Sequence, residues 1–86
     1  MLDREELAQH NEYMLFCDGF DEAIIGVAHR PTLPTVACYD INKMIQILVT
    51  RDNMEEDDAL EYILYNVIGA YMGENTPVYL EEYYGN

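Results

Sequence analysis

The spacing of apolar residues predicts two amphipathic helices in the second half of the chain. One covers residues 40–53, where Asp40 is suited to cap the first turn and Asn53 to stop the helix in a left-handed conformation. The other runs from residue 55 or 56 to residue 72, with Gly73 as its C-cap. The apolar stripes consist of Ile41, Met44, Ile45 and Leu48 in the first helix, and of Leu60, Ile63, Leu64, Val67, Ile68 and Tyr71 in the second.

The rest of the pattern predicts one more helix and three short strands. Asp3 can cap a helix whose modest apolar stripe extends to about residue 15. Residues 23–28 form a continuous apolar run, which is typical of a strand covered on both faces. Residues 35–39 predict a second strand, and the loop at 29–34 suits an antiparallel hairpin. Residues 76–80 predict a third, with Pro77 at its start or on the sheet edge.

This order of elements predicts one α+β domain over residues 1–86. The order is helix, strand, strand, helix, helix, strand, which favours a small, mostly antiparallel sheet of about three strands packed against three helices on one side. Half of the residues are apolar, so a core can form although the chain is near the lower size limit for one.

Charge divides the chain into two unlike parts. No lysine or arginine follows Arg51, while nine carboxylates and six tyrosines do, so this stretch supplies −9 of the net charge of −13. Such a balance argues against direct binding to nucleic acid or to an anionic membrane, because both require basic residues. A dense acidic surface interleaved with tyrosines is instead suited to a basic protein partner.

The sharpest acidic cluster lies at the start of the last predicted helix. One interpretation is structural, because the helix dipole favours acids in a first turn. The other is a contact for lysine or arginine on a partner. The cluster lacks the alternating ligands and central glycine of an EF-hand calcium loop, and we expect no metal or cofactor. The candidate partner-binding residues here are Glu55, Glu56, Asp57, Asp58 and Glu61.

A row of tyrosines is predicted on the same helix, turned away from its apolar stripe. Tyr62 and Tyr65 form this row together with Gly69 and Met72. Either the first helix of the chain covers the row, or it marks an interface, since tyrosine is enriched where proteins meet. In the second case, the row could bind a partner or a second copy of the chain. Further candidate contacts lie at the C-terminal end: Glu81, Glu82, Tyr83 and Tyr84.

The histidines and cysteines do not form a recognisable catalytic or metal motif. His10, Cys17, His29 and Cys38 have zinc-binding side chains, but no pair has the short spacing of a structural zinc site. Cys38 lies in an apolar run and is expected to pack in the core, while Asp18 should raise the pKa of the Cys17 thiol. We therefore predict a protein without enzymatic activity, although a small-molecule enzyme remains a third interpretation.

The one concentrated positive spot is His29 with Arg30. It could hold an anion, but we expect it to pair with the chain's own carboxylates. Two cysteines and an N-terminus without a secretory pattern lead us to expect a reducing, cytoplasmic location with free thiols.

Several segments resemble small uncharacterised acidic proteins encoded by tailed bacteriophages. The most distinctive are YNVIGAY at residues 65–71 and GENTP at residues 73–77, and the resemblance also includes DEAIIGV at 21–27, the pair Tyr39 and Asp40, and DALEY at 58–62. The resemblance implies the cytoplasm of an infected bacterium. It also implies a class in which some members inhibit host nucleic-acid enzymes by imitating DNA charge. The sequence therefore predicts a phage accessory factor or inhibitor that binds a basic host protein, with a homo-oligomeric scaffold as the alternative.

Overall fold

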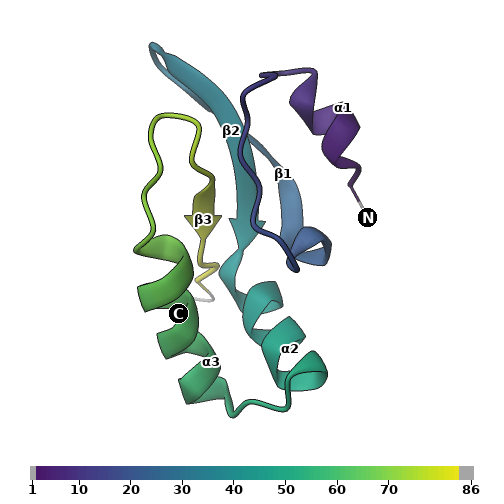
Figure 1. Cartoon of the computed structure of the whole chain (residues 1–86), viewed down its shortest axis with the longest axis vertical. Coiled ribbons are helices and arrows are strands. Elements are labelled where there is room, and N and C mark those ends of the chain that lie inside the picture. Colours follow the sequence, from purple (N-terminus) through teal and green to yellow (C-terminus); the bar gives the residue numbers. More distant parts are fainter. Residues whose placement is uncertain (1, 84–86) are drawn as a thin grey trace.

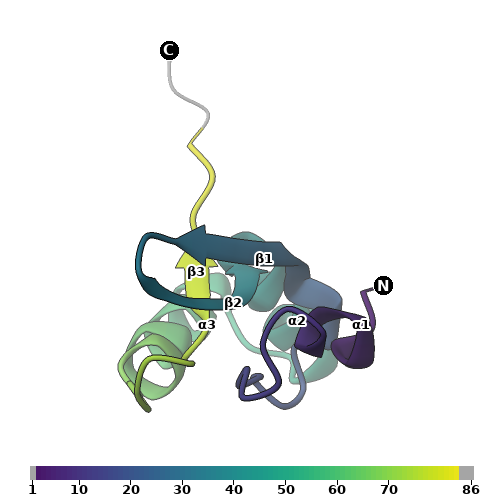
Figure 2. The same ribbon diagram turned by 90° about the horizontal axis from the view of Figure 1, so that it is seen from above.

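The computed structural model describes residues 2–83, which form a three-stranded sheet with the helices on one face (Figures 1 and 2). The purple and green helices lie below the sheet in Figure 2, and the teal helix, which continues from the end of a strand, is seen partly behind it. The elements are α1 (Arg4–Ala8), the short 3-10 helix η1 (Asp21–Ala23), β1 (Ile24–Arg30), β2 (Leu33–Asp40), α2 (Ile41–Arg51), α3 (Glu56–Tyr62), the π-helix η2 (Ile63–Ile68) that continues α3, and β3 (Val78–Leu80).

The sheet is mixed, with β2 at its centre. β1 runs antiparallel to β2, and β3 runs parallel to it, with Tyr39 beside Tyr79 in the register. The α+β class and the three strands are as predicted, but the expectation of a mostly antiparallel sheet is wrong. The reason is the connection, because α3 and the loop after it carry the chain back toward the start of β2 before β3 begins (Figure 1).

The hairpin between β1 and β2 is tighter than predicted. Its turn consists of Pro31 and Thr32 alone, and Thr32 takes a left-handed conformation with φ of 60°. Both strands are correspondingly longer than expected. β1 is not covered on both faces, since Ile25 is exposed on a sheet whose helices lie on one side.

α1 ends at Ala8, whereas the sequence pattern predicted a helix to about residue 15. Asp3 caps it as expected, since its carboxylate accepts the Glu5 N–H at 3.0 Å. Beyond the helix, the Asn11 side chain accepts the Tyr13 N–H at 3.0 Å and donates to the Asn75 side chain at 2.8 Å. These bonds compete with helical pairing, so the chain turns there instead of continuing the helix.

α2 agrees closely with its prediction. The Asp40 carboxylate accepts the N–H groups of Asn42 and Lys43 at 2.8 and 3.2 Å, and Asn53 has a φ of 57°. The stripe is buried at Ile41, Met44 and Leu48, and half-buried at Ile45.

The last helix begins as predicted but ends at Ile68, four residues early, and Gly73 lies in the loop that follows. Contacts outside the helix hold that loop. The Thr76 hydroxyl accepts the Met72 N–H at 2.8 Å, and the Glu74 carbonyl accepts the Arg30 guanidinium at 2.6 Å.

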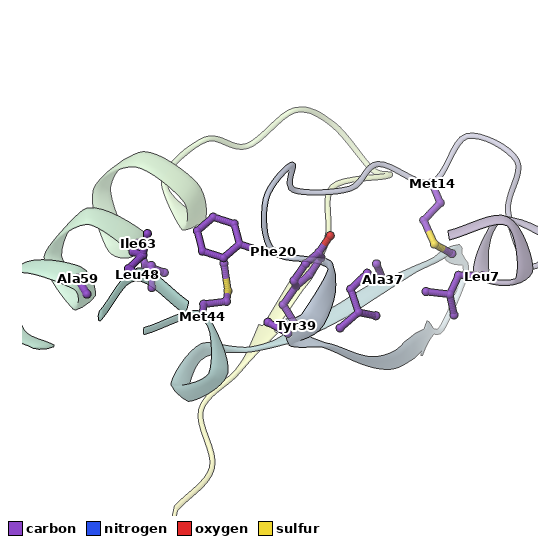
Figure 3. Close-up of a cluster of buried hydrophobic side chains, with 11 residues drawn as sticks. Leu7, Met14, Phe20, Ala37, Tyr39, Met44, Leu48, Ala59 and Ile63 are labelled. Carbon is purple, nitrogen blue, oxygen red and sulfur yellow. The ribbon is translucent and has the colours of Figure 1, made fainter. Parts of the chain in front are cut away.

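The core lies between the sheet and the helices and extends from α1 to α3 (Figure 3). Tyr39 on β2 is fully buried near its middle. Leu7 and Met14 close the core at one end, and Ala59 and Ile63 at the other. The same packing holds the start of α3 against α2, which leaves the opposite side of α3 open to solvent.

Candidate partner-binding surface

The acidic cluster at the start of α3 faces solvent. Glu55 is the N-cap residue but its side chain makes no capping hydrogen bond, and Glu56, Asp57 and Asp58 form the first turn. Glu61 follows one turn later. All five residues are exposed, and within residues 2–83 no lysine or arginine forms a salt bridge with any of them. The helix therefore presents five carboxylates whose charge is not compensated by a neighbouring cation.

The arginines of the chain are engaged elsewhere. Arg4 pairs with Asp21 at 2.6 Å and with Asp18 at 3.3 Å, and Arg51 pairs with Asp52 at 3.1 Å. Arg30 was expected to pair with carboxylates, but it donates to two backbone carbonyls, those of Pro34 and Glu74, both at 2.6 Å. The prediction for Arg30 is thus wrong, because its guanidinium bonds to carbonyl oxygens of the hairpin and of the loop before β3.

The tyrosine row on the last helix is not covered by the rest of the chain. Tyr65 is 76% exposed and Tyr62 is 44% exposed, while α1 packs at the opposite end of the core (Figures 1 and 3). The interpretation in which α1 covers this row is therefore wrong. Tyr71 and Met72, just beyond the helix, are 74% and 73% exposed and extend the apolar surface.

The π-helix changes which residues of this helix face the core. The Gly69 N–H bonds to the Leu64 carbonyl at 3.1 Å, five residues back, so the wider turn rotates the following residues relative to an α-helix. Leu64, predicted in the core stripe, is exposed. A Cβ at position 69 would lie 2.9 Å from the Tyr65 carbonyl oxygen, so the local backbone accounts for this glycine without a second helix packed against it.

Beside the end of α3 and η2 lies a largely apolar groove of about 250 Å³. It is formed by three separate segments, residues 15–20, 62–72 and 76–79. A second, shallower hollow shares Tyr62 and Asn66 with the groove and is lined in addition by Asp58, Glu61 and Tyr65. Acidic and apolar surfaces are therefore continuous at this point of the molecule. Residues that line the apolar groove include Phe16, Phe20, Tyr62, Val67, Met72 and Tyr79.

The floor of this groove holds polar groups that are paired with each other. The Tyr39 hydroxyl accepts the Cys17 N–H at 2.8 Å, and the Cys17 Sγ lies 3.2 Å from the Tyr79 hydroxyl. Burial raises the pKa of the Cys17 thiol, the pKa of Tyr39 to about 12, and the pKa of Tyr79 above its ordinary value. These groups are protonated at neutral pH, so the thiol is not activated as a nucleophile.

Each cysteine departs from its prediction in one respect. The pKa of Cys17 is raised as expected, but burial is the main cause and Asp18 contributes least. Cys17 packs against the core, whereas Cys38 alternates with the buried Ala37 and Tyr39 along β2 and so faces the other side of the sheet.

The histidines meet without forming a metal centre. His10 and His29 lie edge to face with ring centroids 5.9 Å apart. In the described part of the chain, residues 2–83, no group of three or more histidine, cysteine or acidic side chains is placed to hold a metal ion.

The C-terminal candidates lie apart from those on α3. Glu81, Glu82 and Tyr83 follow β3, and the chain there runs away from the helices (Figure 2). Glu82 lines a hollow with Lys43 and Asp40 at the start of α2. Tyr84 lies outside the described residues. The structure thus places the predicted contact residues in two patches, of which the one on α3 is the larger.

Comparison with known proteins adds no family to this description. No family model, no curated protein and no solved structure matches the chain. Within residues 2–83, none of the helices has the length and apolar character needed to cross a membrane.

Proposed function

We propose that this chain is a non-enzymatic interaction protein that binds a basic surface of another protein through the exposed start of α3. The observation that carries the proposal is the group of five exposed carboxylates, unpaired by any lysine or arginine of residues 2–83, next to exposed tyrosines. The interface combines carboxylates with tyrosine, an amphipathic residue type that is enriched where proteins meet.

The spacing of these charges is suited to the imitation of nucleic acid. The helix rises about 1.5 Å per residue, so the span from Glu55 to Glu61 is about 9 Å long and carries roughly one charge per 2 Å. Duplex DNA carries about one charge per 1.7 Å of its axis. A basic groove that binds phosphates can accept these carboxylates in their place, and the resemblance to tailed-phage proteins makes a host nucleic-acid-binding protein the proposed target.

A competition assay tests this proposal. The chain is titrated into complexes of basic bacterial DNA-binding proteins with a fluorescent oligonucleotide, at several salt concentrations. We expect displacement of the oligonucleotide that weakens steeply with salt, because exposed charges are screened over about 8 Å at physiological ionic strength. A variant with Glu55, Glu56 and Glu61 changed to Gln, and Asp57 and Asp58 changed to Asn, should lose this displacement.

The matched control removes five charges elsewhere. Glu5, Glu6, Glu12, Glu22 and Glu74 are exposed and lie outside α3. Their change to Gln gives the same net charge as the α3 variant. Equal loss of displacement in both variants would show that net charge alone is responsible and would refute α3 as the contact.

The exposed tyrosines favour self-association as a second candidate function. Tyr65, Tyr71 and Met72 lie within eight residues of the chain and are each more than 70% exposed. Two copies that bury this surface must overcome the repulsion between their acids, so association should strengthen with added salt. Light scattering at high micromolar concentration distinguishes the two functions, since the trend with salt is opposite. A strict monomer at all salt concentrations excludes this candidate.

A further inference from the structure

We infer that the apolar groove receives one aromatic or large aliphatic side chain of the basic partner, so that the recognised element is a lysine- or arginine-rich segment with an apolar anchor. This inference rests on the proposed function and goes beyond it, because charge imitation alone requires no groove. It assigns the attraction of basic residues to the acidic surface and the binding of the anchor to the groove.

The size of the groove favours a single side chain. Its volume of about 250 Å³ is below the roughly 300–1,000 Å³ typical of pockets for drug-sized ligands. Apolar side chains, including Phe16, Phe20, Val67 and Met72, form most of its lining, and Asp18, Asn66 and Thr76 are the polar members that do not belong to the Cys17–Tyr79 pair. Anchor residues of protein interfaces typically fill pockets of this kind.

The polar groups of the groove favour an apolar occupant. Cys17 and Tyr79 bond to each other at 3.2 Å, and Tyr39 accepts the Cys17 N–H. Within residues 2–83, no buried side-chain nitrogen or oxygen lacks a hydrogen-bond partner. Around Cys17 and Tyr79, a polar ligand would have to compete with these bonds, whereas an apolar side chain leaves them intact.

The charges beside the groove favour basic residues next to the anchor. Asp58 and Glu61 line the hollow that shares Tyr62 with the groove, and neither forms a salt bridge within residues 2–83. Asp18, among the residues that line the groove, is already paired with Arg4 at 3.3 Å. No lysine or arginine is among the residues that line either concavity. A lysine next to the anchor would meet the carboxylates of the hollow, which is the charge complementarity that fixes register in protein interfaces.

Two synthetic peptides test this inference. Both contain six lysines separated by glycines, and they differ at one central position, which is tryptophan in one and alanine in the other. The chain has no tryptophan, so the fluorescence of the peptide reports only on its own surroundings. We expect the tryptophan peptide to bind about tenfold more tightly or better, with blue-shifted emission. The ratio of the two affinities should persist as salt weakens both.

A variant that fills the groove locates the anchor. Ala70 lines the groove and is exposed, so Ala70→Phe should fill it without disturbing the core. Gln46→Phe places the same side chain on the exposed side of α2 as a control, and circular dichroism verifies that both variants fold. We expect Ala70→Phe to abolish the preference for tryptophan while binding of the alanine peptide is retained, and Gln46→Phe to leave both unchanged.

The outcomes separate the two proposals. Absence of binding by both peptides at low salt would overturn the proposed function, and the inference with it. Equal binding of the two peptides would overturn the inference alone. A tryptophan preference that survives Ala70→Phe would overturn the groove as the place of the anchor.

Discussion

Replacement of Tyr39 by phenylalanine tests how the segment before β1 is held on the sheet. The Tyr39 ring is fully buried, and its hydroxyl accepts the Cys17 N–H at 2.8 Å. Tyr39→Phe preserves the ring in the core and removes the acceptor. A donor left without its partner costs about 1–3 kcal/mol. For a domain of this size, each kcal/mol corresponds to about 4–8 °C in Tm.

The same hydroxyl makes stability depend on alkaline pH. Burial raises the pKa of Tyr39 from 10 to about 12, so between these values the unfolded chain has lost its proton while the folded chain keeps it. The contribution is fully present below pH 10 and is lost as the pH rises toward 12, at about 1.4 kcal/mol per pH unit. Over this range the loss is about 3 kcal/mol, similar to the cost of the substitution at neutral pH.

Urea unfolding of both proteins from pH 7 to pH 12 measures these quantities. The difference between the two free energies of unfolding should be about 1–3 kcal/mol up to pH 10 and should fall by about 3 kcal/mol between pH 10 and pH 12, so that it reaches zero or changes sign. Effects of the overall charge are shared by both proteins and cancel in the difference. Parallel curves above pH 10, or equal stability at pH 7, would falsify the reasoning about this hydroxyl.

Substitutions at three further positions test other parts of the structure. Leu48→Ala removes a core side chain of α2 and should lower the free energy of unfolding, measured in urea, by about 2–5 kcal/mol. A decrease of less than about 1 kcal/mol would contradict its place in the core. Asp40→Ala removes the cap of α2 and should cost about 1 kcal/mol, whereas Asp40→Asn, which retains a capping oxygen, should cost much less. Glu61→Gln should raise stability by a few tenths of a kcal/mol at low salt and weaken the binding of a basic partner, while stronger binding would count against the contact on α3.

The elements that the sequence predicted well are those fixed by local interactions. Asp40, the apolar stripe behind it and Asn53 lie within 14 consecutive residues, and the structure uses each as expected. Pro77 likewise stands immediately before β3, which lies at the edge of the sheet.

The elements that were predicted incorrectly depend on distant partners. α1 is short because Asn11 bonds to the Thr35 carbonyl and to the Asn75 side chain, 24 and 64 residues away. The direction of β3 depends on the path of the whole segment between it and β2. Neither the hydrogen bonds of Asn11 nor the path of the chain before β3 leaves a periodic signal in the sequence.

The candidate site was predictable only in part, for the same reason. The acids and tyrosines of α3 are neighbours in the chain and could be identified from their spacing. The groove beside them could not, because Phe16, Val67 and Tyr79 come from three segments that only the fold brings together. The π-helix is likewise not predicted by a regular 3.6-residue period.

Glu61 is the acid on which the proposed contact depends most. The helix dipole favours Glu56, Asp57 and Asp58 in the first turn by about 0.3–1 kcal/mol each, so these three residues have a structural explanation. Glu61 lies a turn later, four residues after Asp57 and three after Asp58, where like charges destabilise a helix by a few tenths of a kcal/mol. It forms no salt bridge within residues 2–83, and it lines the hollow next to Tyr62. Glu61 therefore has neither a capping nor a packing role, and we propose that it contacts a basic residue of a partner placed in the hollow.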